Sequence, residues 1–192
     1  MSAFRPVPAS AQRTEAWAND AGTTTVLDSG PDAAEWRWRL SIARIDRDAD
    51  FSPLPGVRRR FAPLDAPVTL TFPGGREKHV LRLETFRFDG ADVPHAQLGD
   101  GPTRAFNLML RDGAEGELIA RPLTGAMVLP LARGTRWFFH QLAGRARLDI
   151  AGETIEAEQD ASFWIEATGT LRIEGGGEVV LVRIEDTASP GA

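Results

Sequence analysis

The chain has 192 residues and contains no cysteine and no tyrosine. The lack of cysteine excludes a disulfide scaffold, a thiolate metal site and a cysteine nucleophile. The lack of tyrosine removes one common general acid from any active site. No apolar run approaches the roughly 18 residues of a membrane-spanning helix, and the first residues lack the apolar segment of a signal peptide. We therefore expect a cytoplasmic protein with no membrane partner.

Basic residues are also in deficit. The 22 Lys and Arg residues face 27 Asp and Glu residues, which gives a net charge of −5 and a pI near 5.3. A nucleic-acid-binding surface needs a basic stripe, so we expect no nucleic-acid partner. A chain of this length can form one large domain or two small ones without a disulfide or a metal to hold the core.

Apolar alternation with the two-residue period of β-strands runs through most of the chain. Turns rich in glycine, proline and aspartate are predicted to separate these strands at residues 73–75, 100–103, 151–153 and 175–177. The only helical segments that we expect are short, around residues 10–16 and after Leu27. Many short strands with hairpin spacing indicate an all-β sandwich or barrel.

The last third of the chain has the strand rhythm of a small jelly-roll barrel. A strand runs to Gly144, a hairpin follows over Ala151 and Gly152, and an acidic turn at Asp160 leads into another apolar strand. This order resembles the core of a cupin.

Cupin enzymes usually hold a metal through an HxH pair, a carboxylate and a later histidine. Here the three histidines, His79, His95 and His140, are all far apart in the sequence. We therefore expect no metal and no cofactor, although a site with three scattered ligands remains geometrically open.

The stretch RAFNLMLR, residues 104–111, sets an amide in the middle of an apolar strand. Strand alternation places Asn107 and Met109 on one face and Phe106 and Leu108 on the other. A buried amide without partners costs about 1–3 kcal/mol. Asn107 therefore either meets water or lines a cavity in which it binds a ligand.

The stretch WRWRLSIARI, residues 36–45, repeats this pattern. Trp36, Trp38 and Leu40 share one predicted face, and Arg39 and Ser41 share the other. A barrel that holds a small ligand needs an inward face that is mostly apolar with a few placed polar groups. An arginine can hold a carboxylate through two parallel hydrogen bonds. From these residues alone, a solvated strand face remains the other interpretation.

Four local motifs follow one another within the first 111 residues: AWANDAGTT (16–24), WRLSIA (38–43), FSPLPGVRR (51–59) and PTRAFNLMLR (102–111). They are similar, in the same order, to the patterns W-K-N-G-G-G-x-T, W-R-L-S-I-A, F-S-x-F-P-G-x-x-R and P-x-R-x-x-N-x-M-x-R. These patterns are typical of the HutD/Ves family, bicupin proteins often encoded with histidine-utilisation enzymes. In the first motif the chain departs from the family, because Ala18 replaces a lysine and Asp20 and Ala21 replace two glycines.

The resemblance implies an all-β fold of two cupin-like double jelly-roll barrels (a bicupin) in one compact chain. The barrels would comprise residues 1–111 and 112–192, with a soft boundary across which strands can be exchanged. The resemblance also implies a metal-free binding or regulatory protein rather than an enzyme, with no catalytic residue. Its partner would be a small anionic metabolite such as formylglutamate, and it would moderate histidine utilisation. A homodimer is left open.

With the motifs in order, the polar strand faces are interpreted as pocket walls. We expect Arg39, Ser41, Asn107 and Met109 to converge on one cavity of the N-terminal barrel, with an anionic ligand held mainly by Arg39. Asn19 and Arg59 are expected at the rim of this cavity. Together these six residues are the predicted ligand-binding set.

The sequence is also compatible with two other functions. One is a cupin enzyme of the isomerase or epimerase type acting on a small polar substrate, with His95 or His140 as general base beside Glu84 or Glu166. The spacing of these residues favours none of them in particular. The other is an interaction protein with an empty barrel, which the changed AWANDAG loop would favour.

Overall fold

The computed structural model describes residues 2–185, of which 62% lie in strands and 3% in helix. The helical residues form two short 3₁₀ turns, Ala9–Ala11 and Gly90–Asp92. The prediction of a mostly β chain is therefore confirmed. Within the described residues, no helix is long and apolar enough to cross a membrane.

The chain divides into two compact units. The N-terminal unit comprises residues 11–113, and the C-terminal unit comprises residues 114–185 together with residues 2–10. The first residues belong to the C-terminal unit because strand β1 (Phe4–Pro6) pairs with β15 (Ser162–Ile165). The sequence alone had placed this segment with the N-terminal barrel.

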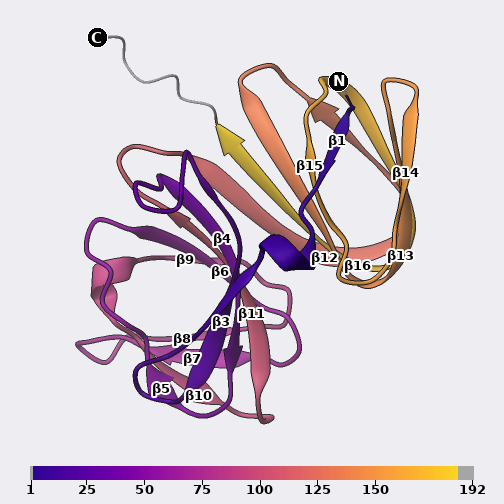
Figure 1. Ribbon diagram of the computed structural model, residues 1–192. Helices are drawn as coiled ribbons and strands as arrows, with labels where there is room; N and C mark the ends of the chain where they lie inside the picture. Colours follow the sequence, from indigo (N-terminus) through magenta and orange to yellow (C-terminus); the bar gives the residue numbers. More distant parts are fainter. Residues whose placement is uncertain (1, 186–192) are drawn as a thin grey trace, which may run out of the picture. The chain divides into compact units, whose positions relative to one another are not determined.

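The N-terminal unit contains two antiparallel sheets (Figure 1). The larger has six strands in the spatial order β2 (Arg13–Ala16), β3 (Gly22–Gly30), β4 (Trp38–Ile45), β11 (Thr103–Leu110), β6 (Arg58–Pro63), β9 (Phe86–Asp89). The smaller has four in the order β5 (Ala49–Asp50), β10 (His95–Leu98), β7 (Val68–Thr71), β8 (Glu77–Val80).

An aromatic core joins the two sheets of the N-terminal unit. Phe61 and Phe88 come from the larger sheet, and they pack in one cluster with Val68, Leu70 and Val80 of the smaller sheet. Phe61 and Phe88 meet edge to face at 6.5 Å between ring centroids, a geometry that aromatic quadrupoles favour. This core fixes the inner face of the larger sheet.

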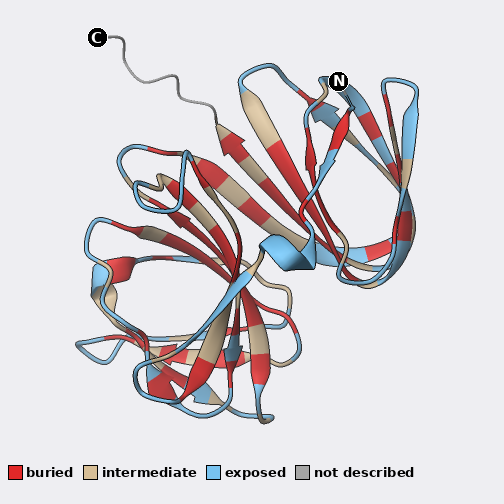
Figure 2. Cartoon of the chain, viewed as in Figure 1, coloured by how far each residue is buried: buried red, intermediate tan, exposed pale blue. Residues whose placement is uncertain are grey.

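The C-terminal unit contains one sheet of six strands. Its spatial order is β1, β15, β13 (Thr135–Ile150), β16 (Gly169–Glu185), β12 (Gly116–Leu131), and β14 (Glu153–Ala157) pairs with β13. Its core alternates along the strands, as in Phe139, Leu148 and Leu181, which are fully buried. Figure 2 shows this alternation as red bands on the long strands.

The glycine run at residues 175–177, predicted to be a turn, lies inside strand β16. Gly175 and Gly177 have φ angles of 156° and 114°, in a region that glycine adopts more readily than any other residue. Gly177 lies opposite Gly144 of β13, next to a register shift between Gln141 and Ala143. The glycines therefore allow β13, with 16 residues, and β16, with 17 residues, to stay paired where their backbones come close.

Two other sequence expectations are wrong for local reasons. The predicted helix at residues 10–16 is a 3₁₀ turn followed by strand β2, and the chain after Leu27 continues as strand β3. The apolar alternation of residues 79–88 is divided between the end of β8 and the start of β9, because Leu83 turns the chain with a φ of 63°.

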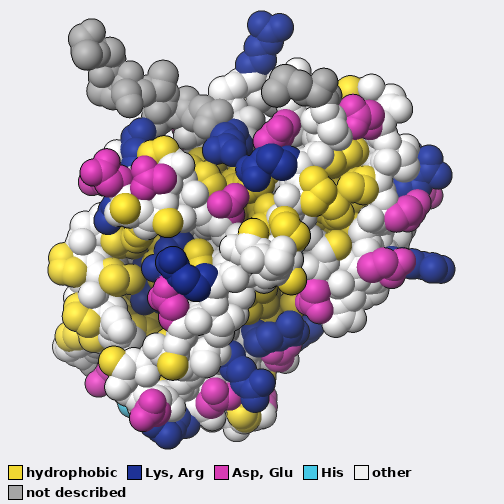
Figure 3. Space-filling view, in the orientation of Figure 1, with side chains coloured by type: hydrophobic (Ala, Val, Ile, Leu, Met, Phe, Trp, Pro, Cys, Tyr) yellow, Lys and Arg dark blue, Asp and Glu magenta, His cyan; other side chains and the backbone are white. Residues whose placement is uncertain are grey.

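Charged side chains of both signs lie beside one another on the face seen in Figure 3. Several form exposed ion pairs within one strand, such as Arg147 with Asp149 and Arg172 with Glu174. Such pairs contribute little to stability. The fold therefore rests on the two apolar cores.

We predict that Gly177→Ala destabilises the protein far more than Gly125→Ala. A Cβ on Gly177 would overlap the carbonyl oxygen of Ala143, whereas a Cβ on Gly125 meets nothing within 4 Å although its φ is also positive, at 91°. We expect a loss of about 3 kcal/mol or more for Gly177→Ala and about 1–2 kcal/mol for Gly125→Ala. Urea unfolding measures both, and equal losses would contradict the close-approach explanation.

Candidate functional site

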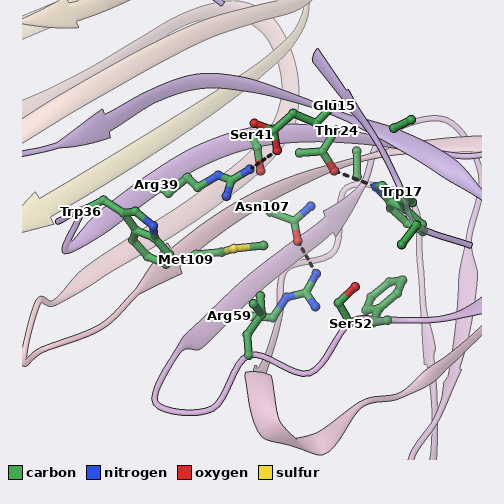
Figure 4. A pocket seen from close by; sticks show the side chains of 15 residues that line it. Glu15, Trp17, Thr24, Trp36, Arg39, Ser41, Ser52, Arg59, Asn107 and Met109 are labelled. Atoms are coloured by element: carbon green, nitrogen blue, oxygen red, sulfur yellow. Dashed lines mark hydrogen bonds and ion pairs between the residues drawn. The ribbon is translucent and has the colours of Figure 1, made fainter. Parts of the chain in front are cut away.

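The larger sheet of the N-terminal unit carries a cavity of about 250 Å³ (Figure 4). About half of its lining residues are apolar or aromatic, and the others carry polar or charged groups. The lining residues are Glu15, Ala16, Trp17, Ala18, Thr24, Trp36, Arg39, Ser41, Ala43, Phe51, Ser52, Leu54, Arg59, Asn107 and Met109.

Strand register brings the polar groups of this cavity together. Across three strands Arg39 lies opposite Met109, and Met109 lies opposite Arg59. In the next row Ser41 lies opposite Asn107. Directly opposed residues on antiparallel strands point to the same face, so these side chains form two adjacent rows on the inner face of the sheet.

Arg59 is the most deeply buried cation that lines the cavity, with 6% of its surface exposed. Burial lowers the pKa of Arg59 to about 10, so its guanidinium still carries a positive charge at neutral pH. Within residues 2–185, no carboxylate oxygen lies within 4 Å of it, and its Nε has no hydrogen-bond partner. Arg59 is therefore a buried charge without a counter-ion among the described residues.

Two aromatic rings and one amide hold this guanidinium in place. It lies over the rings of Phe51 and Phe88, at 4.7 Å and 4.9 Å from their centroids. Its Nη2 donates a hydrogen bond of 3.0 Å to Oδ1 of Asn107. Cation–π contacts and one neutral hydrogen bond offset part of the desolvation of a charge but do not neutralise it.

Asn107 is 1% exposed and has partners on both sides of its amide. While Oδ1 accepts from Arg59, Nδ2 donates to the backbone oxygen of Ala105 at 3.3 Å. The amide that looked anomalous in the sequence thus orients Arg59, in addition to lining the cavity (Figure 4).

The second cation, Arg39, has a partner. Its Nη2 lies 3.8 Å from Oε2 of Glu15, which comes from strand β2. Burial lowers the pKa of Arg39, while the charge of Glu15 acts in the opposite direction. Arg39 is also more exposed than Arg59, since 24% of its side chain is accessible.

Three residues with hydroxyl groups, Thr24, Ser41 and Ser52, complete the polar lining. Oγ of Ser41 is buried and has no hydrogen-bond partner within the described residues. Oγ1 of Thr24 accepts a hydrogen bond of 2.8 Å from Nε1 of Trp17, which fixes that ring at the cavity wall. The hydroxyl of Ser41 therefore remains available to a bound molecule.

The cavity collects five of the six predicted ligand-binding residues, namely Arg39, Ser41, Arg59, Asn107 and Met109. Two details differ from the expectation. Arg59 is buried rather than at the rim, and Asn19 does not line the cavity.

The side chain of Asn19 caps its own loop instead. Its Oδ1 accepts from the backbone nitrogen of Ala21 at 3.1 Å, and its backbone oxygen accepts from Arg47. The neighbouring Asp20 has a φ of 53°, a left-handed conformation that aspartate adopts more readily than most residues. This explains how the loop accommodates an aspartate at a position where the family pattern has glycine.

Sequence reasoning missed Glu15, Phe51 and Ser52, and it put Trp36 on the wrong face. Alternation was extended back to Trp36, but strand β4 begins only at Trp38. Trp36 therefore lies outside the regular strand, where its ring contacts the guanidinium of Arg111 at 4.3 Å and lines the cavity. Glu15 carried no motif, and only the pairing of β2 with β3 brings it to the site.

The histidines lie away from the cavity. His95 pairs with Asp50 at 2.7 Å, Nδ1 of His79 contacts Thr69, and Nδ1 of the buried His140 lies 2.9 Å from Oγ of Ser162. Within the described part of the chain, no three histidine, aspartate or glutamate residues are grouped so that they could hold a metal ion.

The carboxylates considered for an enzyme have other partners. Glu84 pairs with Lys78 at 2.6 Å, and Glu166 pairs with Arg5 at 2.8 Å. Neither residue lines the cavity.

Comparison with solved structures places this architecture in the cupin-like class. A cupin 2 conserved barrel domain protein from Leptotrichia buccalis matches 84% of the chain with a TM-score of 0.52, at 10% identity and 87% coverage of its own chain. At this identity the likeness concerns the fold alone.

The chain belongs to the HutD family, whose model matches residues 9–181. Protein Ves from Cronobacter sakazakii is 28% identical over 171 residues, which cover 88% of this chain and 91% of that protein. HutD from Pseudomonas fluorescens SBW25 has a TM-score of 0.77 at 22% identity, covering 95% of this chain and 98% of that one. A conserved protein of unknown function from Pseudomonas aeruginosa PAO1 reaches 0.81, also at 22% identity, covering 96% and 98%. The resemblance seen in the four motifs is confirmed.

We predict that Arg59→Met leaves the free energy of unfolding unchanged or raises it. The lowered pKa means that the folded protein is penalised for holding the charged guanidinium, and this penalty applies at every pH below about 10. An apolar side chain of similar length removes the penalty, and the lost bond to Asn107 offsets part of the gain. Denaturant unfolding without added anions measures the change.

The exposed Arg87 of neighbouring strand β9 provides the matched control. Arg87→Met should leave the unfolding midpoint unchanged, because surface substitutions have small effects. A loss of about 3 kcal/mol or more in Arg59→Met alone would mean that Arg59 is a structural core residue, contrary to this prediction.

Proposed function

We propose that the protein is a metal-free, cupin-like binding protein that holds a small carboxylate metabolite and thereby moderates histidine utilisation. The observation that carries this proposal is the buried guanidinium of Arg59, which lines the cavity without a carboxylate partner. The histidine-utilisation context is taken from the family to which the chain belongs.

A carboxylate is the ligand group that best complements this guanidinium in charge and hydrogen bonding. It would supply the missing negative charge and accept charge-assisted hydrogen bonds, which are roughly twice as strong as neutral ones. Phe51 and Phe88 pack against the guanidinium, and the burial of Arg59 strengthens an electrostatic contact. A neutral ligand would leave the charge uncompensated.

The remaining lining fits a small molecule with a polar head and an apolar body. The hydroxyl of Ser41 can donate to a second oxygen of the ligand. Met109 and Leu54 offer apolar surface beside it. The volume of about 250 Å³ suits a metabolite of a few carbon atoms rather than a nucleotide. Formylglutamate and related products of histidine breakdown belong to this size class.

We further propose that the two units are the two halves of a bicupin. The N-terminal unit supplies the ligand site and the C-terminal unit a second jelly-roll of long, bent strands. The paired sheets of the N-terminal unit and the glycine bends of β13 and β16 support this interpretation.

We predict that titration calorimetry detects binding of small carboxylates to the wild-type protein and little or none to Arg59→Met. A panel of formate, acetate, glutarate and formylglutamate covers the size range of the cavity. Losing a buried charge-assisted contact should weaken affinity by about 30-fold or more. Ser41→Ala should weaken it by about 5-fold, since one neutral hydrogen bond is lost. Arg87→Met serves again as the control and should bind as the wild type does.

If no carboxylate in the panel binds at millimolar concentration, the proposed ligand class is wrong. If the Arg59→Met variant binds the same compounds with unchanged affinity, they occupy another site.

The regulatory part of the proposal makes a separate prediction. A strain that carries Arg59→Met at the natural locus should grow on histidine like a strain that lacks the gene, because binding is the step that the variant removes. A strain with Arg87→Met should grow like the wild type. Wild-type growth of the Arg59→Met strain, together with impaired growth of the deletion strain, would show that the role in histidine utilisation does not use this pocket.

A further inference from the structure

The carboxylate of Glu15 occupies the side of the cavity opposite Arg59. It lines the cavity from strand β2, where Glu15 lies opposite Thr24 of β3. One of its oxygens faces Arg39 at 3.8 Å, and the other accepts a hydrogen bond of 2.8 Å from Nε of Arg13. Figure 4 shows Glu15 beside Arg39, across the sheet from Arg59. Both oxygens are therefore engaged, and the side chain is held in this position.

The two cations of the cavity are consequently not equivalent. Arg39 faces the carboxylate of Glu15, which it shares with the exposed Arg13 outside the cavity, whereas Arg59 has no carboxylate within 4 Å in the described chain. Ala18, the lining residue beside Trp17, adds no charge. The cavity therefore offers one unbalanced positive charge, at its buried end, and a fixed carboxylate at its more exposed end.

We propose that Glu15 makes the cavity selective for ligands with a single carboxylate whose other end is polar but uncharged. This inference rests on the proposed function and narrows its ligand class. The ligand carboxylate would meet Arg59, and its distal group, an amide or a hydroxyl, would donate to Glu15 or accept from Arg39. A dicarboxylate would bring its second negative charge beside Glu15. A dicarboxylate such as formylglutamate would thus bind less tightly than a monocarboxylate of the same size.

Electrostatics sets the expected size of this selectivity. The Glu15 side chain is 48% exposed, so solvent screens its charge and the repulsion is far below its value in a dry interior. At such a position one like charge within a few ångströms changes affinity by about tenfold. A second ligand carboxylate could instead displace Glu15 from Arg39. Moving Glu15 away would also break its hydrogen bond with Arg13, which opposes the displacement.

The experiment compares diacids with their monoamides, which match them in length and volume and differ by one charge. Succinate with succinamate and glutarate with glutaramate are titrated into the wild-type protein and into Glu15→Gln. The wild type should prefer the monoamide by at least about fivefold. Glu15→Gln should abolish or reverse this preference, because it removes the repulsion and releases Arg39 to bind a second carboxylate. High salt should narrow the wild-type preference.

Glu77→Gln is the matched control, since it removes one negative charge from an exposed side chain on strand β8 of the smaller sheet. It should leave the ratio of monoamide to diacid affinity as in the wild type. Thermal melting checks that both variants are folded, which is expected for substitutions of exposed side chains.

The outcomes separate this inference from the proposed function. If the wild type binds the diacids as tightly as the monoamides or more tightly, or if Glu15→Gln does not change the ratio, the selectivity inference is overturned while carboxylate binding stands. If neither the wild type nor Glu15→Gln binds any of the four compounds, carboxylate binding itself fails and the selectivity fails with it.

Discussion

The site depends on one buried charge, the guanidinium of Arg59. Strand β6 sends it to the inner face of the sheet, where the rings of Phe51 and Phe88 pack against it and Oδ1 of Asn107 accepts a hydrogen bond from it. Each of these contacts comes from a different part of the chain and is fixed by strand register or by the aromatic core. The guanidinium is therefore preorganised, and a ligand does not have to order it before binding.

The burial of the Arg59 charge lowers the free energy of unfolding as long as no anion is bound beside it. Burying a charge without a counter-ion opposes folding, and the pKa of about 10 for Arg59 expresses that opposition. A structural role would be served better by an apolar side chain or by a carboxylate partner. A binding role explains the cost, because an anion that enters the cavity relieves it, and the same relief adds to the affinity for that anion.

Many of the residues that line this cavity could be predicted from the sequence, because strand alternation is a local property. The two strands that contain Ser41 and Asn107 are regular, so their periodicity predicted which side chains share a face, and register then brought them opposite one another. Lining residues whose positions depend on where strands begin or how short strands pair could not be predicted. Trp36 lies just before its strand, and Glu15 lies on a short, exposed strand whose partner is set only by the fold.

The fold shows the same limit. Hydrophobic alternation predicted a mostly β chain, and the four motifs predicted the family. Glycine is ambiguous in such a sequence, because it serves both a turn and a close approach of two strands. At residues 175–177 the second use applies, since β16 continues through them against Gly144. The burial of Arg59 was equally hidden, because its depth depends on Phe51 and Phe88 from other segments.

The choice of asparagine at position 107 follows from the same charge balance. An aspartate there would place a carboxylate 3.0 Å from the guanidinium and complete an internal ion pair. The cavity would then contain no unbalanced charge at its buried end, and an anion would gain little by entering. Asparagine has the same shape and offers the same acceptor oxygen, so it orients Arg59 without neutralising it. The amide in the middle of an apolar strand thus fixes the arginine without supplying a counter-ion, as the proposed binding role requires.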